Sequence, residues 1–206
     1  MPKFKIPKEE EVKLPELRVK FKDIFDLKEF YTALREYLND NDWKDIEDRD
    51  EHWESQYGEH VRQGGVKEMW IWWRLHKVPK NQSYITYYLD FDWHNLGIQE
   101  TEIIREGLKL KVHKGEVEIY IKPYMQLNFV GEFNKHAILK HFTKLFKSRI
   151  YHSQYEKKKK ELYQETYALQ NFMKQWFKFK RYLPYEEVEN FYPSRSWPSH
   201  LQQEKG

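Results

Sequence analysis

A helical repeat of apolar side chains occurs early in the chain, between residues 27 and 38. Its members are Leu27, Phe30, Tyr31, Leu34 and Leu38. Positions three and four residues apart share one face of a helix, so this spacing predicts an amphipathic helix. Asp26 stands where an N-cap residue accepts hydrogen bonds from the first turn, and the polar run 39–42 ends the repeat. Residues 1–16 carry three prolines and predict an extended arm that leads into a short strand near 17–21.

Alternation with a period of two replaces helical spacing between residues 67 and 93. In 67–76, apolar side chains stand at Met69, Ile71, Trp73 and Leu75. In 83–93 they stand at Ile85, Tyr87, Leu89, Phe91 and Trp93. Successive side chains of a strand point to opposite faces, so the two runs predict antiparallel strands joined by a turn at 78–81.

A second hairpin is predicted around Lys114 and Gly115. Alternating apolar residues precede and follow this pair, at Leu108, Leu110, Val112, Val117, Ile119 and Ile121. A two-residue loop would set Lys111 opposite Glu118, which is a favourable cross-strand charge pair. Pro123 has no amide N–H to donate, so it would end the regular pairing or lie at an edge of the sheet.

Residues 36–65 are strongly acidic and show no sustained period. Between residues 36 and 60 the chain has 10 Asp/Glu against 2 Lys/Arg, a balance of −8. The segment ends in two glycines, and its Trp43 and Trp53 follow no face pattern. We predict a long loop here, with at most one helical turn, and loops of this length are often functional.

The last third of the chain is predicted to be helical. From Glu132 to Leu183, 52 residues contain neither Gly nor Pro. A single helix of that length would measure roughly 78 Å, whereas a globule of this size has a diameter of roughly 45 Å. We therefore expect a break near 151–153, beside the lysine run 157–160. Two apolar stripes flank the break, Leu139, Phe142, Phe146 and Ile150 before it and Leu162, Leu169, Phe172, Met173 and Trp176 after it.

Together these elements predict an α+β protein. We expect an antiparallel sheet of about four to six strands, with an N-terminal helix and one or two long C-terminal helices packed on one face. Residues 1–131 would form the sheet domain, with its N-terminal arm and the acidic loop 36–65. Residues 132–183 would form a basic helical segment that belongs to this domain or projects from it, followed by a C-terminal tail, 184–206. The order is compatible with a helix-grip topology, a likeness that carries no function.

Composition and motifs exclude several classes of protein. Aromatic residues make up 17% of the chain, which favours a packed interior although 33% of the residues are charged. No cysteine is present, so disulfides, thiolate nucleophiles and cysteine-bound metals are excluded. Glycine-rich phosphate-binding motifs and the Gly-x-Ser-x-Gly elbow are absent as well. We therefore expect no cofactor and lean toward a protein that is not an enzyme.

Membrane association has little support in the sequence. The chain has no apolar run of about 18 residues and no apolar signal-peptide core near its beginning. We expect no integral membrane segment and a cytoplasmic location. The aromatic and basic residues 172–181 resemble an interfacial anchor, but their apolar stripe has to cover a sheet, which argues against a role at a membrane surface.

Positive charge concentrates in the predicted C-terminal helices. Between Phe133 and Tyr182 there are 13 Lys/Arg against 3 Glu, a balance of +10. Opposite the second stripe, lysines that can meet phosphates alternate with tyrosines that can stack on unpaired bases. This pattern predicts a non-enzymatic protein that binds RNA or a ribonucleoprotein such as the ribosome. The residues assigned to nucleic-acid binding are Lys157, Lys158, Lys159, Lys160, Tyr163, Tyr167, Lys174, Lys178, Lys180 and Arg181.

Other interpretations of the charges stay open. The basic face could be a solvated surface that pairs with the acidic residues 36–60 of the same chain. Alternatively, acidic and basic regions of different copies or partners could meet, which would make the protein an interaction or homo-oligomerisation module.

Two clusters on the predicted sheet also have a functional and a plain structural interpretation. Alternation places Asp90, Asp92 and His94 on one face, where they could bind a divalent metal or mark a small-ligand site, or simply be a solvent-facing strand end. An aromatic surface could stack bases, or could be core beneath the C-terminal helix. Its members are Trp70, Trp72, Tyr84 and Tyr88.

Overall fold

The computed structural model describes residues 6–49, 52–80, 84–105 and 107–178. The protein is α+β with one seven-stranded antiparallel sheet, which confirms the predicted class and exceeds the four to six strands expected. The strands are β1 (Glu11–Lys13), β2 (Leu17–Phe25), β3 (Lys44–Asp45), β4 (Glu54–Val61), β5 (Lys67–Lys77), β6 (Ile85–Arg105) and β7 (Leu108–Leu127).

Two long central strands organise the sheet. β6 pairs with β7 along nearly its whole length and with β5 on its other side. The shorter strands share the two edges, because β1 and β2 both pair with β7, while β3 and β4 both pair with β5. The sheet is larger than expected because two separate segments of the chain occupy each edge.

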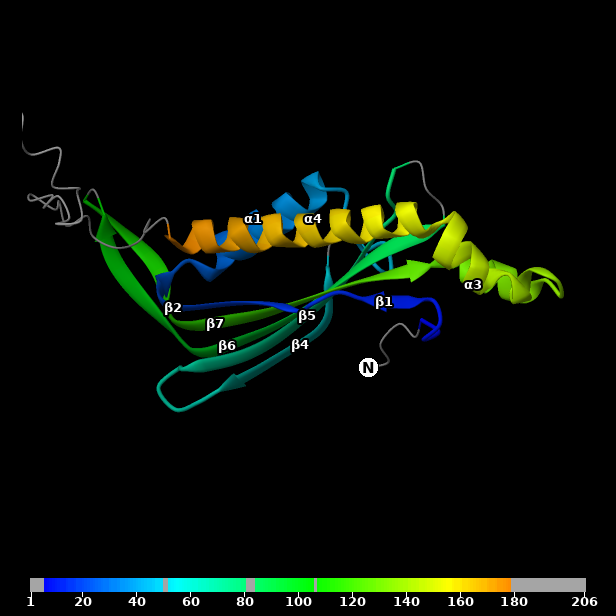
Figure 1. Ribbon diagram of the computed structural model, residues 1–206. Coiled ribbons are helices and arrows are strands. Elements are labelled where there is room, and N and C mark those ends of the chain that lie inside the picture. Colours follow the sequence, from blue (N-terminus) through cyan, green and yellow to red (C-terminus); the bar gives the residue numbers. More distant parts are fainter. Residues whose placement is uncertain (1–5, 50–51, 81–83, 106, 179–206) are drawn as a thin grey trace, which may run out of the picture.

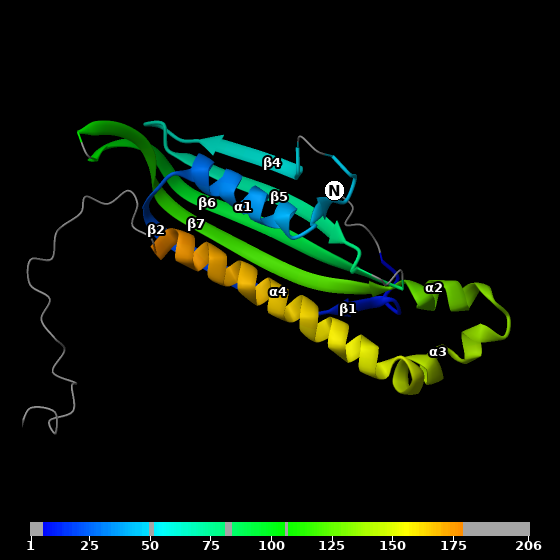
Figure 2. The same cartoon turned by 90° about the horizontal axis from the view of Figure 1, so that it is seen from above.

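Helices cover one face of this sheet (Figure 1). α1 and α4 lie side by side along the strands, whereas α2 and α3 extend beyond the end of the sheet (Figure 2). Within the described ranges, the opposite face carries no helix. The helical elements are α1 (Leu27–Asp40), α2 (Asn128–Lys135), the 3-10 turn η1 (Leu139–His141), α3 (Thr143–Leu145), the π-helical turn η2 (Phe146–Ile150) and α4 (His152–Lys178).

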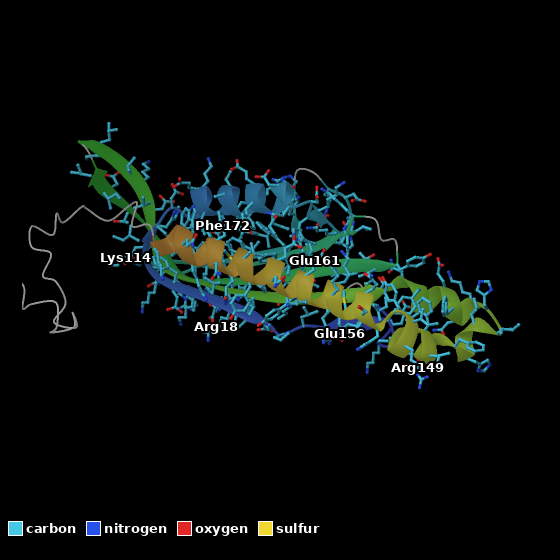
Figure 3. The ribbon with its side chains drawn as sticks, turned by 45° about the horizontal axis from the view of Figure 1, so that its top comes forward. Arg18, Lys114, Arg149, Glu156, Glu161 and Phe172 are labelled. Carbon is cyan, nitrogen blue, oxygen red and sulfur yellow. The ribbon has the colours of Figure 1, made fainter. Side chains whose placement is uncertain are left out.

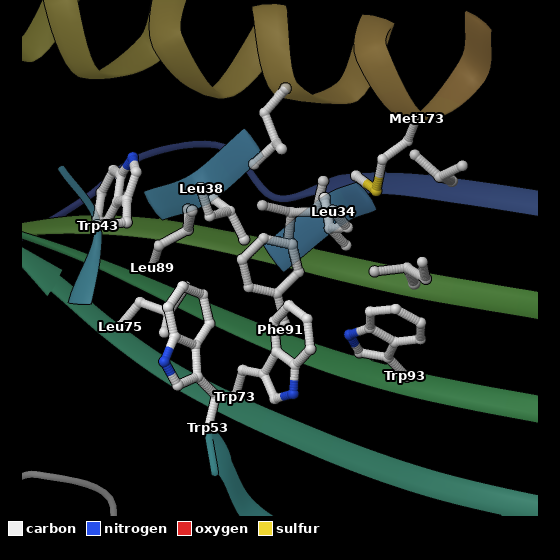
Figure 4. Close-up of a cluster of buried hydrophobic side chains, with 14 of the residues drawn as sticks. Leu34, Leu38, Trp43, Trp53, Trp73, Leu75, Leu89, Phe91, Trp93 and Met173 are labelled. Carbon is white, nitrogen blue, oxygen red and sulfur yellow. The ribbon is translucent and has the colours of Figure 1, made fainter. Parts of the chain in front are cut away.

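The core is a layer of aromatic and aliphatic side chains between the helices and the sheet (Figure 4). Trp73 of β5 and Trp93 of β6 are buried in it with ring centroids 5.2 Å apart. The ring of Phe30 in α1 lies 5.6 Å from that of Trp93 and 4.8 Å from that of Trp176 in α4. Each aromatic side chain removes about 150–250 Å² from water, so this layer dominates the attachment of both helices to the sheet.

α1 begins and ends as predicted. Asp26 accepts hydrogen bonds from the backbone N–H groups of Lys28 and Glu29 at 2.9 and 3.0 Å, which satisfies two donors of the first turn. Asn41 follows the helix as its C-cap. The residues of α1 buried against the sheet are Phe30, Leu34 and Leu38.

The prediction of a long acidic loop over residues 36–65 is wrong. α1 continues to Asp40, and the segment then forms β3 and β4, which both pair with β5. β4 is an edge strand whose residues are exposed or half-buried, so it has no apolar alternation to reveal it in the sequence. Trp53, just before β4, is buried with its ring 5.6 Å from Trp73 and fixes this edge to the core.

The prediction of a hairpin turn at Lys114 and Gly115 is also wrong, because both residues lie inside the continuous strand β7. The chain reverses instead between Arg105 and Leu108, which pair with each other. Gly107 has a φ of 79° in this reversal, a backbone conformation that glycine adopts without steric cost. The turn therefore lies at the end of a ribbon whose strands have 21 and 20 residues, much longer than the arms predicted at 108–112 and 117–121.

Gly115 allows a close approach of two strands rather than a turn. It faces a β-bulge in β6, where the register shifts between Leu96 and Gln99. A Cβ atom at Gly115 would stand 2.6 Å from Cδ1 of Ile98 and 3.1 Å from the carbonyl oxygen of Gly97. A side chain at this position would therefore collide with the bulge. Beyond it, the β6–β7 ribbon bends away from the rest of the sheet (Figure 1).

The longer ribbon changes the predicted pairing on both sides of Gly115. Lys111 lies opposite Glu102, and Glu118 lies opposite His94 of β6. Pro123 does not end the strand, since β7 continues to Leu127. It sits where the edge partner of β7 changes from β2 to β1, a position that needs no amide donor toward the edge.

The C-terminal helical region is broken close to the predicted position, since Tyr151 separates η2 from α4. Two further expectations were wrong. The lysine run 157–160 lies within α4 rather than at the junction. The first apolar stripe does not pack as a unit, because Phe146 is half-buried while Leu139, Phe142 and Ile150 are exposed.

The tail 184–206, together with Lys180 and Arg181, lies outside the described residues. In the described part of the chain, no helix combines the length and the apolar character needed to cross a membrane.

We predict that Gly115→Ala lowers the free energy of unfolding by about 1–3 kcal/mol, because the new methyl group overpacks the bulge in β6. Gly58→Ala is the matched control, since a Cβ atom there meets only the Trp70 ring at 3.7 Å, an ordinary contact. Chemical denaturation of the two variants measures the difference. Equal stability of the two variants would contradict the close approach at Gly115.

Candidate functional site

α4 is held on the sheet by its second apolar stripe and by polar contacts that set its rotation. Gln170 donates a hydrogen bond to the carbonyl oxygen of Arg18 on β2 at 3.0 Å. Glu165 accepts hydrogen bonds from Lys77 at 2.5 Å and from Trp43 Nε1 at 3.0 Å. These contacts fix which residues of α4 face outward. Its buried apolar residues are Leu162, Leu169, Met173, Trp176 and Phe177.

Residues 179–181 of the predicted interfacial anchor lie outside the described part of the chain, and the aromatic rings of 172–178 are used in this packing. The ring of Phe172 stacks on Tyr37 of α1 with centroids 4.3 Å apart, on the side of α4 that faces α1 (Figure 3). Trp176 and Phe177 are buried. These aromatic rings attach α4 to the rest of the protein.

The opposite side of α4 is exposed along its length. Tyr163 and Tyr167 stand one turn apart there, with ring centroids 5.3 Å apart and planes inclined by 51°. From Lys160 to Lys178 the helix rises by roughly 27 Å. We call this surface the α4 outer face and define it as Lys160, Tyr163, Tyr167, Lys174 and Lys178, all exposed.

The lysine run next to the α4 outer face divides between exposed and paired side chains. Lys157 is exposed, like Lys160. The side chain of Lys158 is only 13% exposed and donates to Glu161 at 2.8 Å. Lys159 lies 3.9 Å from Glu156. Glu156 and Glu161 therefore neutralise the middle of the run (Figure 3).

The described acidic residues of 36–60 do not neutralise the α4 outer face. Their carboxylates find partners nearby, as when Arg49 donates to Asp45 at 2.8 Å and Lys67 lies 3.3 Å from Glu59. Among the ion pairs of the described residues, none involves a lysine of the α4 outer face. The positive charge of this face therefore has no counterpart within the described part of the molecule.

Comparison with known proteins gives no assignment. The sequence matches no protein-family model and no curated protein.

The proposed metal ligands lie on the sheet face away from the helices, where each has another partner. Arg74 donates to Asp92 at 2.7 Å, and Lys122 makes a second hydrogen bond to the same carboxylate. Asp90 is buried and accepts a hydrogen bond from Tyr124 at 3.2 Å. In the part of the chain that the structure describes, no group of three His, Asp or Glu side chains is placed to hold a metal ion.

His94 belongs to a separate cluster on the same face. Its Nε2 lies 2.9 Å from Oε1 of Glu68, and its ring stacks on Trp70 with centroids 5.3 Å apart. The hydrogen bond with His94 is the main reason why the pKa of Glu68 lies below its ordinary value. His94 thus takes part in a hydrogen bond and a ring stack that are distinct from the contacts of Asp92.

Burial alone would raise the pKa of Asp92, but the hydrogen bond from Lys122 and the charge of Arg74 outweigh it and hold the pKa below its ordinary value. Burial and the charge of Asp90 raise the pKa of Tyr124. The sequence did not reveal Arg74 and Lys122 as the cationic partners of Asp92. Alternation along β5 and β7 places both on the Asp90 face, and strand register sets both opposite Asp90.

The aromatic surface that could stack bases or form core beneath the C-terminal helix does not lie beneath that helix. Trp70, Trp72 and Tyr88 lie on the sheet face away from α4. There the Tyr88 ring stacks on Tyr124 at 5.1 Å, and Arg74 lies 5.2 Å over the Trp72 ring. These rings shield the ion pairs of the uncovered sheet face from water.

A small-ligand site would have a different location from the one the sequence suggested. An open hollow of about 570 Å³ lies beside the bend of the β6–β7 ribbon. It shares no residue with Asp90, Asp92 or His94. Its lining includes Tyr57, Lys67, Gln99 and His113.

We predict that Asp92→Asn lowers the free energy of unfolding by about 1–3 kcal/mol at neutral pH, since it removes charge-assisted hydrogen bonds. The pKa of Asp92 is depressed in the folded state, so its contribution is complete above the unfolded value near 3.9 and is lost as pH falls through the folded value. Denaturant titrations across this range should show the two proteins converging at low pH. Asp23→Asn, at an exposed position of β2, is the control. A pH-independent difference would refute this account.

Proposed function

We propose that this protein is a non-enzymatic binding protein that contacts RNA or a ribonucleoprotein through the α4 outer face. The supporting observation is that three lysines without a described carboxylate partner flank two neighbouring tyrosine rings on one exposed helical face. Lysines meet phosphates, and tyrosine rings stack on unpaired bases. Neither role requires a cofactor or a nucleophile.

The way α4 is attached favours this role. Its apolar stripe and the hydrogen bond from Gln170 to Arg18 hold the helix on the sheet, so the outward side chains keep their spacing. A preorganised face loses less conformational entropy on binding than a disordered basic segment. Single-stranded RNA suits the face better than duplex, because duplex bases are stacked inside the helix and cannot pack on Tyr163 and Tyr167.

Charge reversal at Lys174→Glu and Lys178→Glu should weaken RNA binding at least tenfold and flatten its salt dependence. For single strands, log K changes with log salt by about −0.7 per phosphate contact, so losing two contacts lowers the slope by about 1.4. Filter binding or fluorescence anisotropy over a salt series measures both quantities. The control is Lys44→Glu with Lys80→Glu, an equal charge change at exposed positions outside α4. Unchanged affinity in the Lys174 and Lys178 variant would sink the proposal.

Tyr163→Ala with Tyr167→Ala should weaken binding to unstructured RNA by about 1–3 kcal/mol per stacked base and leave the salt slope unchanged, because no phosphate contact is lost. Phenylalanine at both positions keeps the rings and should bind nearly as the unmodified protein does. The same anisotropy titrations apply. Loss of binding in the Phe variant would point to the hydroxyl groups instead of stacking.

A further inference from the structure

Residues 128–151 form a compact helical knob between the end of β7 and the start of α4. The knob extends beyond the end of the sheet, at one end of the long axis of the molecule (Figure 2). It holds α2, η1, α3 and η2, so the backbone passes through α, 3-10 and π turns within a short span. Its position leaves its tip clear of the helices and strands that form the main core.

A small aromatic cluster holds the knob together from inside. The ring of Phe146 lies 5.3 Å from Phe129, 5.1 Å from Phe133 and 5.7 Å from Tyr151. Phe129 is buried, and Phe146 and Tyr151 pack against the core. The knob is therefore a folded part of the protein with an interior of its own.

Large apolar side chains cover the outside of the knob. The most exposed are Ile138 at 73% and Ile150 at 67%. The exposed large apolar side chains of the knob all fall within residues 138–150, and a concentration of this kind usually marks an interaction site. The complete set, which we call the knob surface, is Ile138, Leu139, Phe142, Leu145 and Ile150.

The charge of the knob is mainly positive, with Glu132 as its one acidic residue. From Phe133 to Tyr155 the chain contains no Asp or Glu. The same stretch contains lysines, histidines and an arginine, and Lys135 and Arg149 are exposed; Figure 3 shows Arg149 on the knob. The partner of the knob surface should therefore be negatively charged and apolar beneath its charge.

We propose that the knob surface docks on an anionic lipid membrane, with Ile138, Phe142 and Ile150 entering the interface between headgroups and acyl chains. Lysine and arginine beside aliphatic and phenylalanine side chains are typical of segments that lie in a membrane surface. Protein interfaces, in contrast, are depleted in lysine. RNA offers no apolar phase for isoleucine and leucine. The inference is independent of the α4 outer face.

The attachment is peripheral and reversible. The knob surface contributes only a few side chains, which resembles a single weak anchor rather than an inserted segment. Cations near an anionic leaflet each add about 1 kcal/mol of attraction, and this attraction falls with salt. Docking by the tip keeps α1 and the sheet away from the lipid, so the fold has no need to open (Figure 1).

The test is sedimentation of the full chain with vesicles of phosphatidylcholine alone and of phosphatidylcholine mixed with phosphatidylserine. We expect binding to the mixed vesicles only, and at least a tenfold loss of it in Ile138→Ser with Ile150→Ser. The matched control is Ile104→Ser with Leu108→Ser, both 67% exposed at the tip of the β6–β7 ribbon, which should bind as the unmodified protein does. Lys135→Glu with Arg149→Glu should weaken binding and reduce its salt dependence.

A second readout reports insertion directly. The chain has no cysteine, so Ile138→Cys can carry a single environment-sensitive fluorophore, with Ile104→Cys as the comparison. Mixed vesicles should shift the emission of the label at 138 to the blue and leave the label at 104 unchanged.

Several results would overturn the proposal. They are failure of the unmodified protein to bind mixed vesicles, equal binding to both kinds of vesicle, and undiminished binding by the Ile138 and Ile150 variant. Capture of RNA or of an acidic protein through the knob surface, with no vesicle binding, would also overturn it. Circular dichroism of each variant confirms that it is folded, and Lys174→Glu with Lys178→Glu should leave vesicle binding intact.

Discussion

The pairing of β6 with β7 is the constraint on which the rest of the molecule depends. These strands have 21 and 20 residues, so the ribbon they form measures roughly 66 Å at about 3.3 Å per residue. A compact globule of this chain length has a diameter of roughly 45 Å, so the ribbon forces an elongated shape. α4, with 27 residues and a length of roughly 40 Å, can lie along the ribbon without being broken. At one end the ribbon extends beyond α1 and α4 as the bent tip, and at the other end the chain leaves β7 for the knob, which lies beyond the end of the sheet (Figures 1 and 2).

Local signals in the sequence were sufficient where they did not depend on distant residues. The Asp26 cap and the alternation around Trp73 are decided within a few positions, and both predictions agree with the structure. Gly115 was misread as a turn because its role depends on the bulge at Gly97, which approaches only after β6 and β7 have paired. β4 escaped notice because an edge strand with solvent on both faces has no apolar pattern.

The candidate site was predictable from the sequence where it depends on one helix, and not where it depends on strand pairing. The helical wheel placed Lys160, Tyr163 and Tyr167 on one face, and the structure exposes them, because a regular helix carries its pattern without outside help. The ion pairs of Asp92 could not be predicted locally, because they depend on the register of three strands, which brings Arg74 and Lys122 close to its carboxylate. Ion pairing also differs between the two charged regions. Acidic residues of 36–60 pair with nearby cations, whereas the lysines of the α4 outer face pair with no carboxylate among the described residues.

The knob shows how a correct local pattern can end on the surface. Leu139, Phe142 and Phe146 follow helical spacing, so one continuous helix would have turned them all to one side. The chain, however, leaves β7 at the end of the sheet and has to reverse direction before α4 can run back along it (Figure 2). The reversal breaks the helix into 3-10, α and π turns, turns Phe146 inward to the aromatic cluster and leaves Phe142 outside. Burial of the exposed apolar side of the knob would add hydrophobic free energy that folding alone does not supply. A membrane with an anionic surface would offer an apolar phase to these side chains and negative charge to the neighbouring cations.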